Sequence, residues 1–208
     1  MAGAGPLLGS TLALVYAQAH RERVTEIILV AVTNGSRREI DWITQDVGRI
    51  FPEEWARFRA GVPESEQDGR LVEAYARLLN DPDSAVRDRA ARDWCAWEDA
   101  HVSPAPDHRP SPRFADPVFR VGFARLVTHY WSNGCFIEDG SVLRDAGRLA
   151  GIPGVMIHGR YDVSGPLETA WCLAREWPDA ELIVVGDSGH ASASMTDHIL
   201  AATDHLRP

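Results

Sequence analysis

The 208-residue sequence is short of cysteine, of positive charge and of long hydrophobic runs. Three cysteines, Cys95, Cys135 and Cys172, are an odd number without repeated spacing, which argues against a disulfide framework and a metal cluster and favours reduced thiols in a cytoplasmic protein. A formal net charge of −9 argues against a nucleic-acid or anionic-membrane partner, since either needs a basic stripe. No apolar run reaches the ~18 residues that a membrane-spanning helix requires.

Apolar segments at the two ends of the chain predict one α/β core. A helix is expected over 10–20, followed by a buried strand over 24–32, because continuous β-branched runs are typical of parallel strands. After Pro153 come the strand GVMIHGR, a helix over about 166–176, the strand ELIVVG and a last helix over about 193–205. Strands and helices that alternate with short links are typical of βαβ units.

The middle of the chain has a different pattern, with aromatic and aliphatic residues at helical spacing. Asp83 or Ser84 can cap one of its helices. The sequence therefore predicts a partial α/β core formed by 1–34 and 149–208, with 35–148 inserted as a helical cap.

Two polar motifs directly follow the last two predicted strands. GRYDVSGP at 159–166 carries Asp162, and SGH at 188–190 carries His190. We expect these two side chains to meet, so that the carboxylate accepts the imidazole N–H and fixes its tautomer for proton transfer. The alternative is that Asp162 caps the helix that begins near Pro166 and that His190 is a surface loop residue.

A serine nucleophile is missing from the place where this order of acid and base predicts it. In α/β-hydrolases the serine precedes both residues, on a strand-to-helix elbow written G-x-S-x-G. This sequence has GPLLG at 5–9, with Leu7 where the serine belongs. Ser10 is the nearest hydroxyl, but its place in the first turn of the next helix favours a helix-start role.

From Gly9 to its C-terminus the chain resembles the prolyl aminopeptidases (proline iminopeptidases), which are serine peptidases of the α/β-hydrolase fold. The segments that carry the resemblance are GSTLALVYAQAH at 9–20, FPEEWARF, AVRDRAARDWCAWE, FARLVTHYWSNGCF at 123–136 and IPGVMIHGRYDVSGP at 152–166. The resemblance implies the C-terminal part of an α/β-hydrolase fold, with about three parallel strands, flanking helices and an inserted helical cap.

The resemblance also implies site residues and a substrate. Asp162 and His190 match the acid and base of the family's catalytic triad, and Glu98 matches a cap glutamate that holds the substrate's free α-amino group. The implied substrate is a small peptide with a free N-terminal proline, and the family uses no metal or organic cofactor. Taken alone, Glu98 would instead be a residue on a helix surface.

Three departures from the family pattern bear on activity. Leu7 occupies the nucleophile position, the family's early strands and H-G-G-P-G oxyanion loop have no counterpart, and Val127 replaces a second amine-binding glutamate. We therefore expect a truncated member that is inactive alone. One hypothesis is a frameshift: if Leu7-Leu8-Gly9 is encoded CTC-CTG-GG, the same bases read one position later give TCC-TGG, which is Ser-Trp.

Other functions stay open on the sequence alone. The chain can be a non-catalytic remnant that acts as a binding module, or an esterase or amidase of the same fold, which the valine at 127 favours. Without early strands, the strand at 24–32 would have an unpaired edge, so we also expect marginal stability and self-association through that edge.

Overall fold

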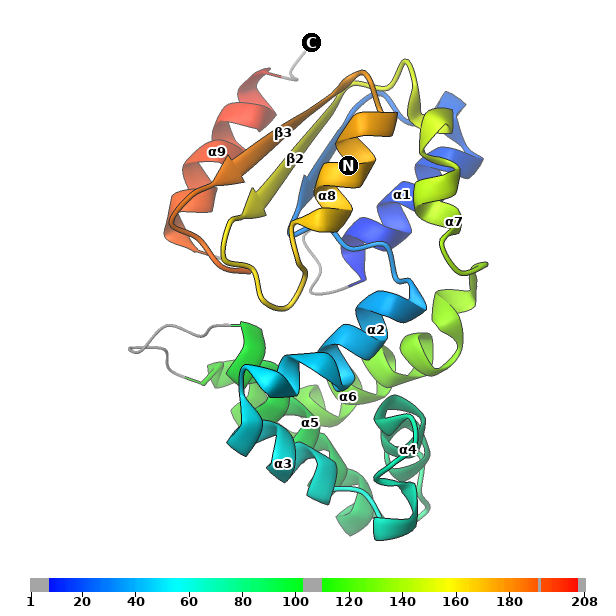
Figure 1. Ribbon diagram of the computed structural model, residues 1–208, viewed down its shortest axis with the longest axis vertical. Helices are drawn as coiled ribbons and strands as arrows, with labels where there is room; N and C mark the ends of the chain where they lie inside the picture. The colour runs from blue at the N-terminus through cyan, green and yellow to red at the C-terminus, as the bar shows by residue number, and fades with distance from the viewer. Residues whose placement is uncertain (1–7, 103–109, 191, 206–208) are drawn as a thin grey trace. The chain divides into compact units, whose positions relative to one another are not determined.

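The computed structural model describes residues 8–102, 110–190 and 192–205 (Figure 1). The chain divides into two compact units. The first, which we call the α/β unit, comprises Met1–Gly35 and Glu138–Pro208, and the second, which we call the helical unit, comprises Ser36–Ile137.

A three-stranded parallel sheet forms the centre of the α/β unit (Figure 1). Its strands lie in the order β1 (Ile27–Val30), β2 (Gly154–Gly159) and β3 (Ala180–Val185). In the register, Ile27 pairs with Gly154, which pairs in turn with Ala180. This arrangement confirms the predicted α/β class, and it brings the carboxyl ends of all three strands to one edge of the sheet.

Strand β1 is shorter than the strand expected over 24–32. Ala31 has a φ of 51°, in the left-handed region, so the backbone turns out of the sheet directly after Val30. The amide of Val32 then donates to the side chain of His158 instead of to a strand. The early end of β1 thus brings the following residues to the polar end of β2.

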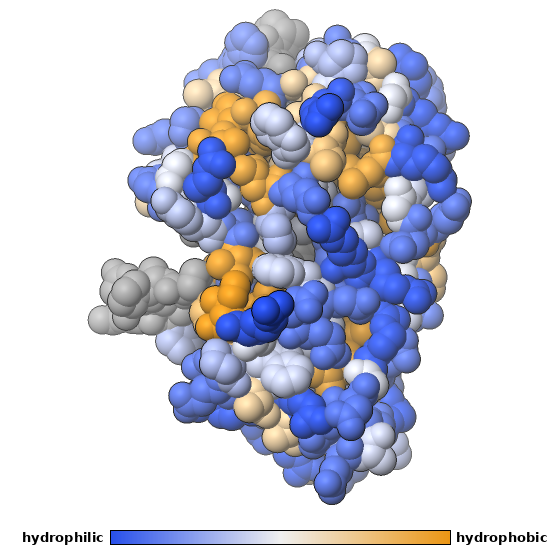
Figure 2. Space-filling view, viewed as in Figure 1, coloured by the Kyte–Doolittle hydropathy of each residue, from blue (hydrophilic) through white to orange (hydrophobic). Residues whose placement is uncertain are grey.

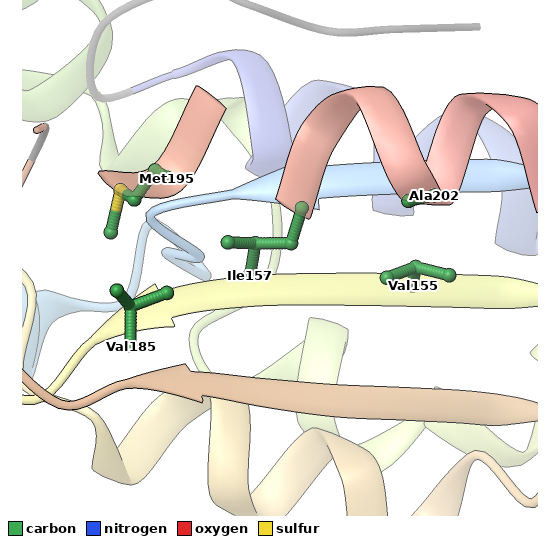
Figure 3. Close-up of a cluster of buried hydrophobic side chains, with 5 residues drawn as sticks. All are labelled: Val155, Ile157, Val185, Met195 and Ala202. Carbon is green, nitrogen blue, oxygen red and sulfur yellow. The ribbon is translucent and has the colours of Figure 1, made fainter. Parts of the chain in front are cut away.

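Helices cover both faces of this sheet. Helix α9 (Ala193–His205) lies on one face, and α1 (Gly9–Ala19) and α8 (Glu168–Glu176) lie on the other (Figure 1). Figure 3 shows the apolar cluster that α9 covers, which consists of Val155, Ile157, Val185, Met195 and Ala202. Because side chains alternate along a strand, His158 points to the face opposite α9.

The short helices α7 (Ser141–Arg144) and η6 (Ala146–Leu149) belong to the α/β unit, although α7 and all of η6 except Leu149 fall within the range expected for the cap. Both contact α1, and Val142 and Leu149 are buried. Their apolar side chains therefore extend the α/β core.

The helical unit is built around aromatic side chains. Its α-helices are α2 (Arg37–Thr44), α3 (Pro52–Ala60), α4 (Leu71–Leu78), α5 (Ser84–Val102) and α6 (Pro117–Ser132). Besides η6, the described residues include the short 3-10 turns η1 (Arg21–Arg23), η2 (Asp46–Arg49), η3 (Glu64–Glu66), η4 (Pro112–Ala115) and η5 (Gly134–Phe136).

In this aromatic core, the ring of Phe58 stacks on Tyr75 with 4.6 Å between centroids and meets the edge of Trp94 at 5.6 Å. All three side chains are buried. At the start of α5, the Asp83 carboxylate accepts the N–H of Ala85 at 2.8 Å, so Asp83 provides the expected cap.

The surface is mostly hydrophilic on the face drawn in Figure 2, with apolar surface over the region where Figure 1 draws β3. That strand is at an edge of the sheet, and Leu182, Ile183 and Val184 are partly exposed there. Across the three described ranges, no helix combines the length and the apolar character needed to span a membrane.

Candidate active site

Asp162 and His190 meet beyond the carboxyl ends of β2 and β3. His190 Nδ1 lies 2.9 Å from Asp162 Oδ2. The side chain of Asp162 is fully buried and that of His190 is 11% exposed. Since an ionised carboxylate only accepts hydrogen bonds, this contact assigns the proton to Nδ1 and leaves Nε2 as the proton-accepting nitrogen of the neutral ring.

The second oxygen of Asp162 supports its own loop. Asp162 Oδ1 accepts the N–H of Gly165 at 2.9 Å. Helix α8 has Leu167 at its N-cap, with no side-chain cap, so the alternative role of Asp162 as a helix cap is wrong. The low exposure of His190 likewise excludes a surface loop role.

A glycine lets the two loops approach each other. A Cβ atom added to Gly159 would lie 2.0 Å from the carbonyl oxygen of Gly189, which is far inside contact distance. Next to it, Tyr161 N–H donates to Ser188 O at 2.9 Å. Gly159, the first residue of the GRYD motif, therefore allows the loop that carries Asp162 and the loop that carries His190 to contact each other.

His158 is a polar residue of this site that the sequence reasoning missed. It is completely buried near the end of β2, and its Nε2 lies 3.6 Å from Asp162 Oδ2. Burial lowers the pKa of His158, while the Asp162 carboxylate and the Gly165 carbonyl oppose this effect. The available signal was a histidine inside the otherwise apolar strand GVMIHG.

The segment after β1 is tied to the start of α1. Ser10 Oγ accepts the N–H of Thr33 at 3.0 Å, and Thr11 Oγ1 donates to the Thr33 carbonyl at 3.1 Å. Ser10 is buried in the first turn of α1, and its hydroxyl bonds Thr33 and does not cap the helix, whose N-cap is Leu8. Leu7, at the predicted nucleophile position, lies outside the described residues.

Glu98 belongs to the helical unit and not to the unit that holds Asp162 and His190. It is 5% exposed on α5, so the alternative of a helix-surface residue is wrong. Its Oε2 lies 3.6 Å from Nε2 of the fully buried His101, one turn further along the helix. A buried carboxylate requires a charged or hydrogen-bonding partner, which makes Glu98 chemically distinct within this aromatic core.

Neither a reactive thiol of Cys95 or Cys135 nor a metal-binding cluster is found among the residues that the structure describes. Burial, followed by the nearby Glu98, raises the pKa of Cys95 to about 12, and burial raises the pKa of Cys135 to about 11. Neither is therefore a ready nucleophile. Among the residues that the structure describes, no group of three or more His, Cys, Asp or Glu side chains is placed to hold a metal ion.

The chain is similar in sequence to proteins named proline iminopeptidase. A probable proline iminopeptidase of Streptomyces coelicolor is 47% identical over 201 residues, which cover 94% of this chain and 62% of the relative. A proline iminopeptidase of Xylella fastidiosa (strain Temecula1) is 41% identical and is covered to 64%. The resemblance read from the motifs is thus confirmed, and the chain spans less than two thirds of the length of these relatives.

The fold comparisons agree with the sheet topology. An alpha/beta fold family hydrolase from Bacillus anthracis superposes with a TM-score of 0.52 at 17% identity, covering 96% of this chain and 64% of that structure. A family model described as the alpha/beta hydrolase fold matches residues 8–193. The chain therefore belongs to the alpha/beta hydrolase fold family.

Proposed function

We propose that this chain carries the acid, the base and the cap of a serine aminopeptidase of the prolyl aminopeptidase type. The observation that carries the proposal is the buried Asp162–His190 contact of 2.9 Å beyond the ends of two parallel strands. Relatives named proline iminopeptidase support the substrate class.

In the intact mechanism, a serine at the elbow attacks the prolyl carbonyl. His190 Nε2 takes the serine proton and later gives it to the leaving amine, while Asp162 holds the ring orientation and stabilises the imidazolium. Because leucine carries no hydroxyl, a chain with Leu7 at the elbow position does not hydrolyse peptides by this route.

Glu98 is the residue of the helical unit to which we assign substrate binding. A buried carboxylate that pairs with a protonated α-amino group selects free N-termini and rejects internal peptide bonds, since those carry no charge at that point. Its 5% exposure supports this role, because a water-excluded carboxylate interacts more strongly with a cation than an exposed one.

An esterase or amidase of the same fold is the second candidate. The observation that favours it is Val127, which stands at the second amine-binding position and is 2% exposed on α6. With one carboxylate in place of two, the preference for a charged amine is weaker, and neutral substrates are penalised less.

A chimera tests the first candidate. The N-terminal segment of the Streptomyces coelicolor relative, up to the residue that aligns with Leu8, is joined to residues 9–208 of this chain, and hydrolysis of prolyl arylamide is compared with that of N-acetyl-prolyl arylamide. We expect the chimera to cleave only the free-amine substrate. We also expect Glu98→Gln to raise KM, whereas Glu73→Gln on exposed α4 surface leaves it unchanged.

Faster cleavage of simple esters and blocked substrates would select the esterase candidate. A chimera that folds and binds prolyl amides without cleaving any substrate would instead leave the non-catalytic binding module. Hydrolysis of prolyl arylamide by the unmodified chain would contradict the role assigned to position 7.

We further propose that the chain self-associates through the edge of its sheet. Within the described residues, β1 pairs with β2 on one side and with no strand on the other, and open edges of this kind pair with strands of other molecules. Light scattering over about a hundredfold range of concentration tests this, with a constant monomer mass as the contradicting result.

The three free cysteines support a cytoplasmic location, where thiols stay reduced.

A further inference from the structure

The imidazole of His158 bridges two backbone segments. The Val32 N–H donates to Nδ1 at 3.1 Å, and Nε2 lies 2.6 Å from the Gly165 carbonyl oxygen. The ring is completely buried, so neither contact competes with water. One contact fixes the end of β1 and the other fixes the loop that carries Asp162.

These two partners define a single protonation state. A backbone N–H only donates, so Nδ1 must hold a lone pair, and a carbonyl only accepts, so Nε2 must hold the proton. A charged ring would place a second N–H against the Val32 amide. Asp162 and His190 are the titratable groups that face the ring, and burial outweighs the carboxylate in keeping it neutral.

The bridge continues to His190 through the backbone of Gly165, whose C=O and N–H belong to two successive peptide groups. His158 Nε2–H donates to Gly165 O, the N–H of Gly165 donates to Asp162 Oδ1 at 2.9 Å, and Asp162 Oδ2 accepts from His190 Nδ1 at 2.9 Å. At each link one partner can act in only one way, because a carbonyl or carboxylate accepts and a backbone N–H donates. Polar chains of this kind reinforce one another in a low-dielectric interior.

We propose that His158 is a positioning residue for the acid–base pair. Its Nε2–H holds the Gly165 carbonyl, which fixes the backbone of this residue, and the Gly165 N–H keeps the Asp162 carboxylate turned toward His190. The importance of the pair for catalysis rests on the proposed function, but the positioning itself is a property of this chain that can be measured without turnover.

The two nitrogens of His158 can be tested separately. A glutamine side-chain amide reaches the place of Nε2 and can donate to Gly165 O, whereas the shorter asparagine reaches the place of Nδ1 and can only satisfy Val32. Leucine fills much of the volume but leaves both backbone groups without their partner. If His158 only filled space, leucine would be the mildest of these substitutions.

The experiment is NMR of the whole 208-residue chain with 15N-labelled histidine. We expect His158 to carry its proton on Nε2, and His190 to show a hydrogen-bonded Nδ1–H signal, which His190→Ala assigns. This signal persists in His158→Gln and is lost, or exchanges at least about tenfold faster, in His158→Asn and His158→Leu. His205→Gln, on exposed α9 surface, is the matched control and leaves the signal unchanged.

A proton on Nδ1 of His158, or a His190 signal that survives in both the asparagine and leucine variants, would overturn the proposal. If leucine prevents folding, the comparison of glutamine with asparagine decides alone. If the His190 Nδ1–H signal responds to the His158 variants as expected but the chimera is inactive, the proposed function is rejected and the positioning role of His158 still holds.

Discussion

The two units bury their polar groups in different ways. The α/β unit gathers Thr33, His158, Asp162 and Ser188 among its buried residues, around the carboxyl ends of its strands. The helical unit instead packs aromatic rings against one another, and its buried Glu98 and His101 lie on one helix. The first pattern is a hydrogen-bonded network between loops, whereas the second is an aromatic core in which a buried carboxylate lies 3.6 Å from a buried imidazole.

This difference indicates where function depends on geometry. Aromatic packing tolerates small shifts, since dispersion is spread over many contacts. A network of hydrogen bonds does not, because each link depends on distances near 2.9 Å and on the right tautomer. We therefore expect changes in the helical unit to alter stability most and changes in the α/β network to alter chemistry most.

The substitution with the largest expected effect on stability removes a ring from the aromatic core. Phe58→Ala removes a buried ring that stacks on Tyr75 and Trp97, and should lower the free energy of unfolding by about 3–5 kcal/mol. Urea unfolding measures this. Phe136→Ala, at a 60% exposed site, is the control and should cost under about 1 kcal/mol. Equal losses at the two positions would contradict the assigned core.

A second substitution breaks the contact between the two site loops. Gly159→Ala places a methyl group 2.0 Å from a backbone oxygen, so the loops must separate, at a cost of about 1–3 kcal/mol or more. The His190 Nδ1–H signal should disappear. Gly186→Ala, where an added Cβ meets nothing within 4 Å, is the matched control. An unchanged signal in Gly159→Ala would show that the loops do not need this approach.

Much of this arrangement was predictable from local pattern. Strand and helix periodicity gave the parallel sheet, and the positions of Asp162 and His190 directly after strands predicted that they meet, which the 2.9 Å contact bears out. Asp83 was recognisable as a cap because capping is local.

The remainder depends on contacts between residues far apart in sequence. The 24–32 run looked like one strand because most of its residues are β-branched, but Ala31 adopts a positive φ, which the side-chain pattern does not indicate. His158 was missed because its partners, Val32 and Gly165, are identified only after the strands are paired. The burial of Glu98 likewise follows from packing around α5 and not from its helical spacing.

A third prediction concerns acid stability. His158 has a folded pKa below its ordinary value of 6.5, so the unfolded chain binds this proton more readily than the folded chain. Stability is therefore constant with respect to this group above pH 6.5 and falls as the pH drops below it, by at most ~1.4 kcal/mol per pH unit. His158→Gln should make this part of the profile shallower in urea titrations. An identical slope in the variant would contradict the assignment.

The smallest expected effect is a difference in reactivity among the three cysteine thiols. Cys95 and Cys135 are buried with raised pKa values, whereas Cys172 is partly exposed on α8. At about pH 8, a thiol-specific disulfide reagent should modify one cysteine per folded chain and three in urea. Cys172→Ser should abolish the fast reaction. Rapid modification of two or three thiols would mean that the helical core opens readily.

The acid–base assignment is tested by comparing kcat/KM on prolyl arylamide between the chimera and its Asp162→Asn variant. We expect a loss on the order of 10⁴-fold, because the substitution removes the buried carboxylate that sets the histidine tautomer. Asp187→Asn, in the same loop as His190 but exposed, should change the rate less than about threefold. Activity of Asp162→Asn within about tenfold of the parent would contradict the assignment of Asp162 and His190 as the acid–base pair.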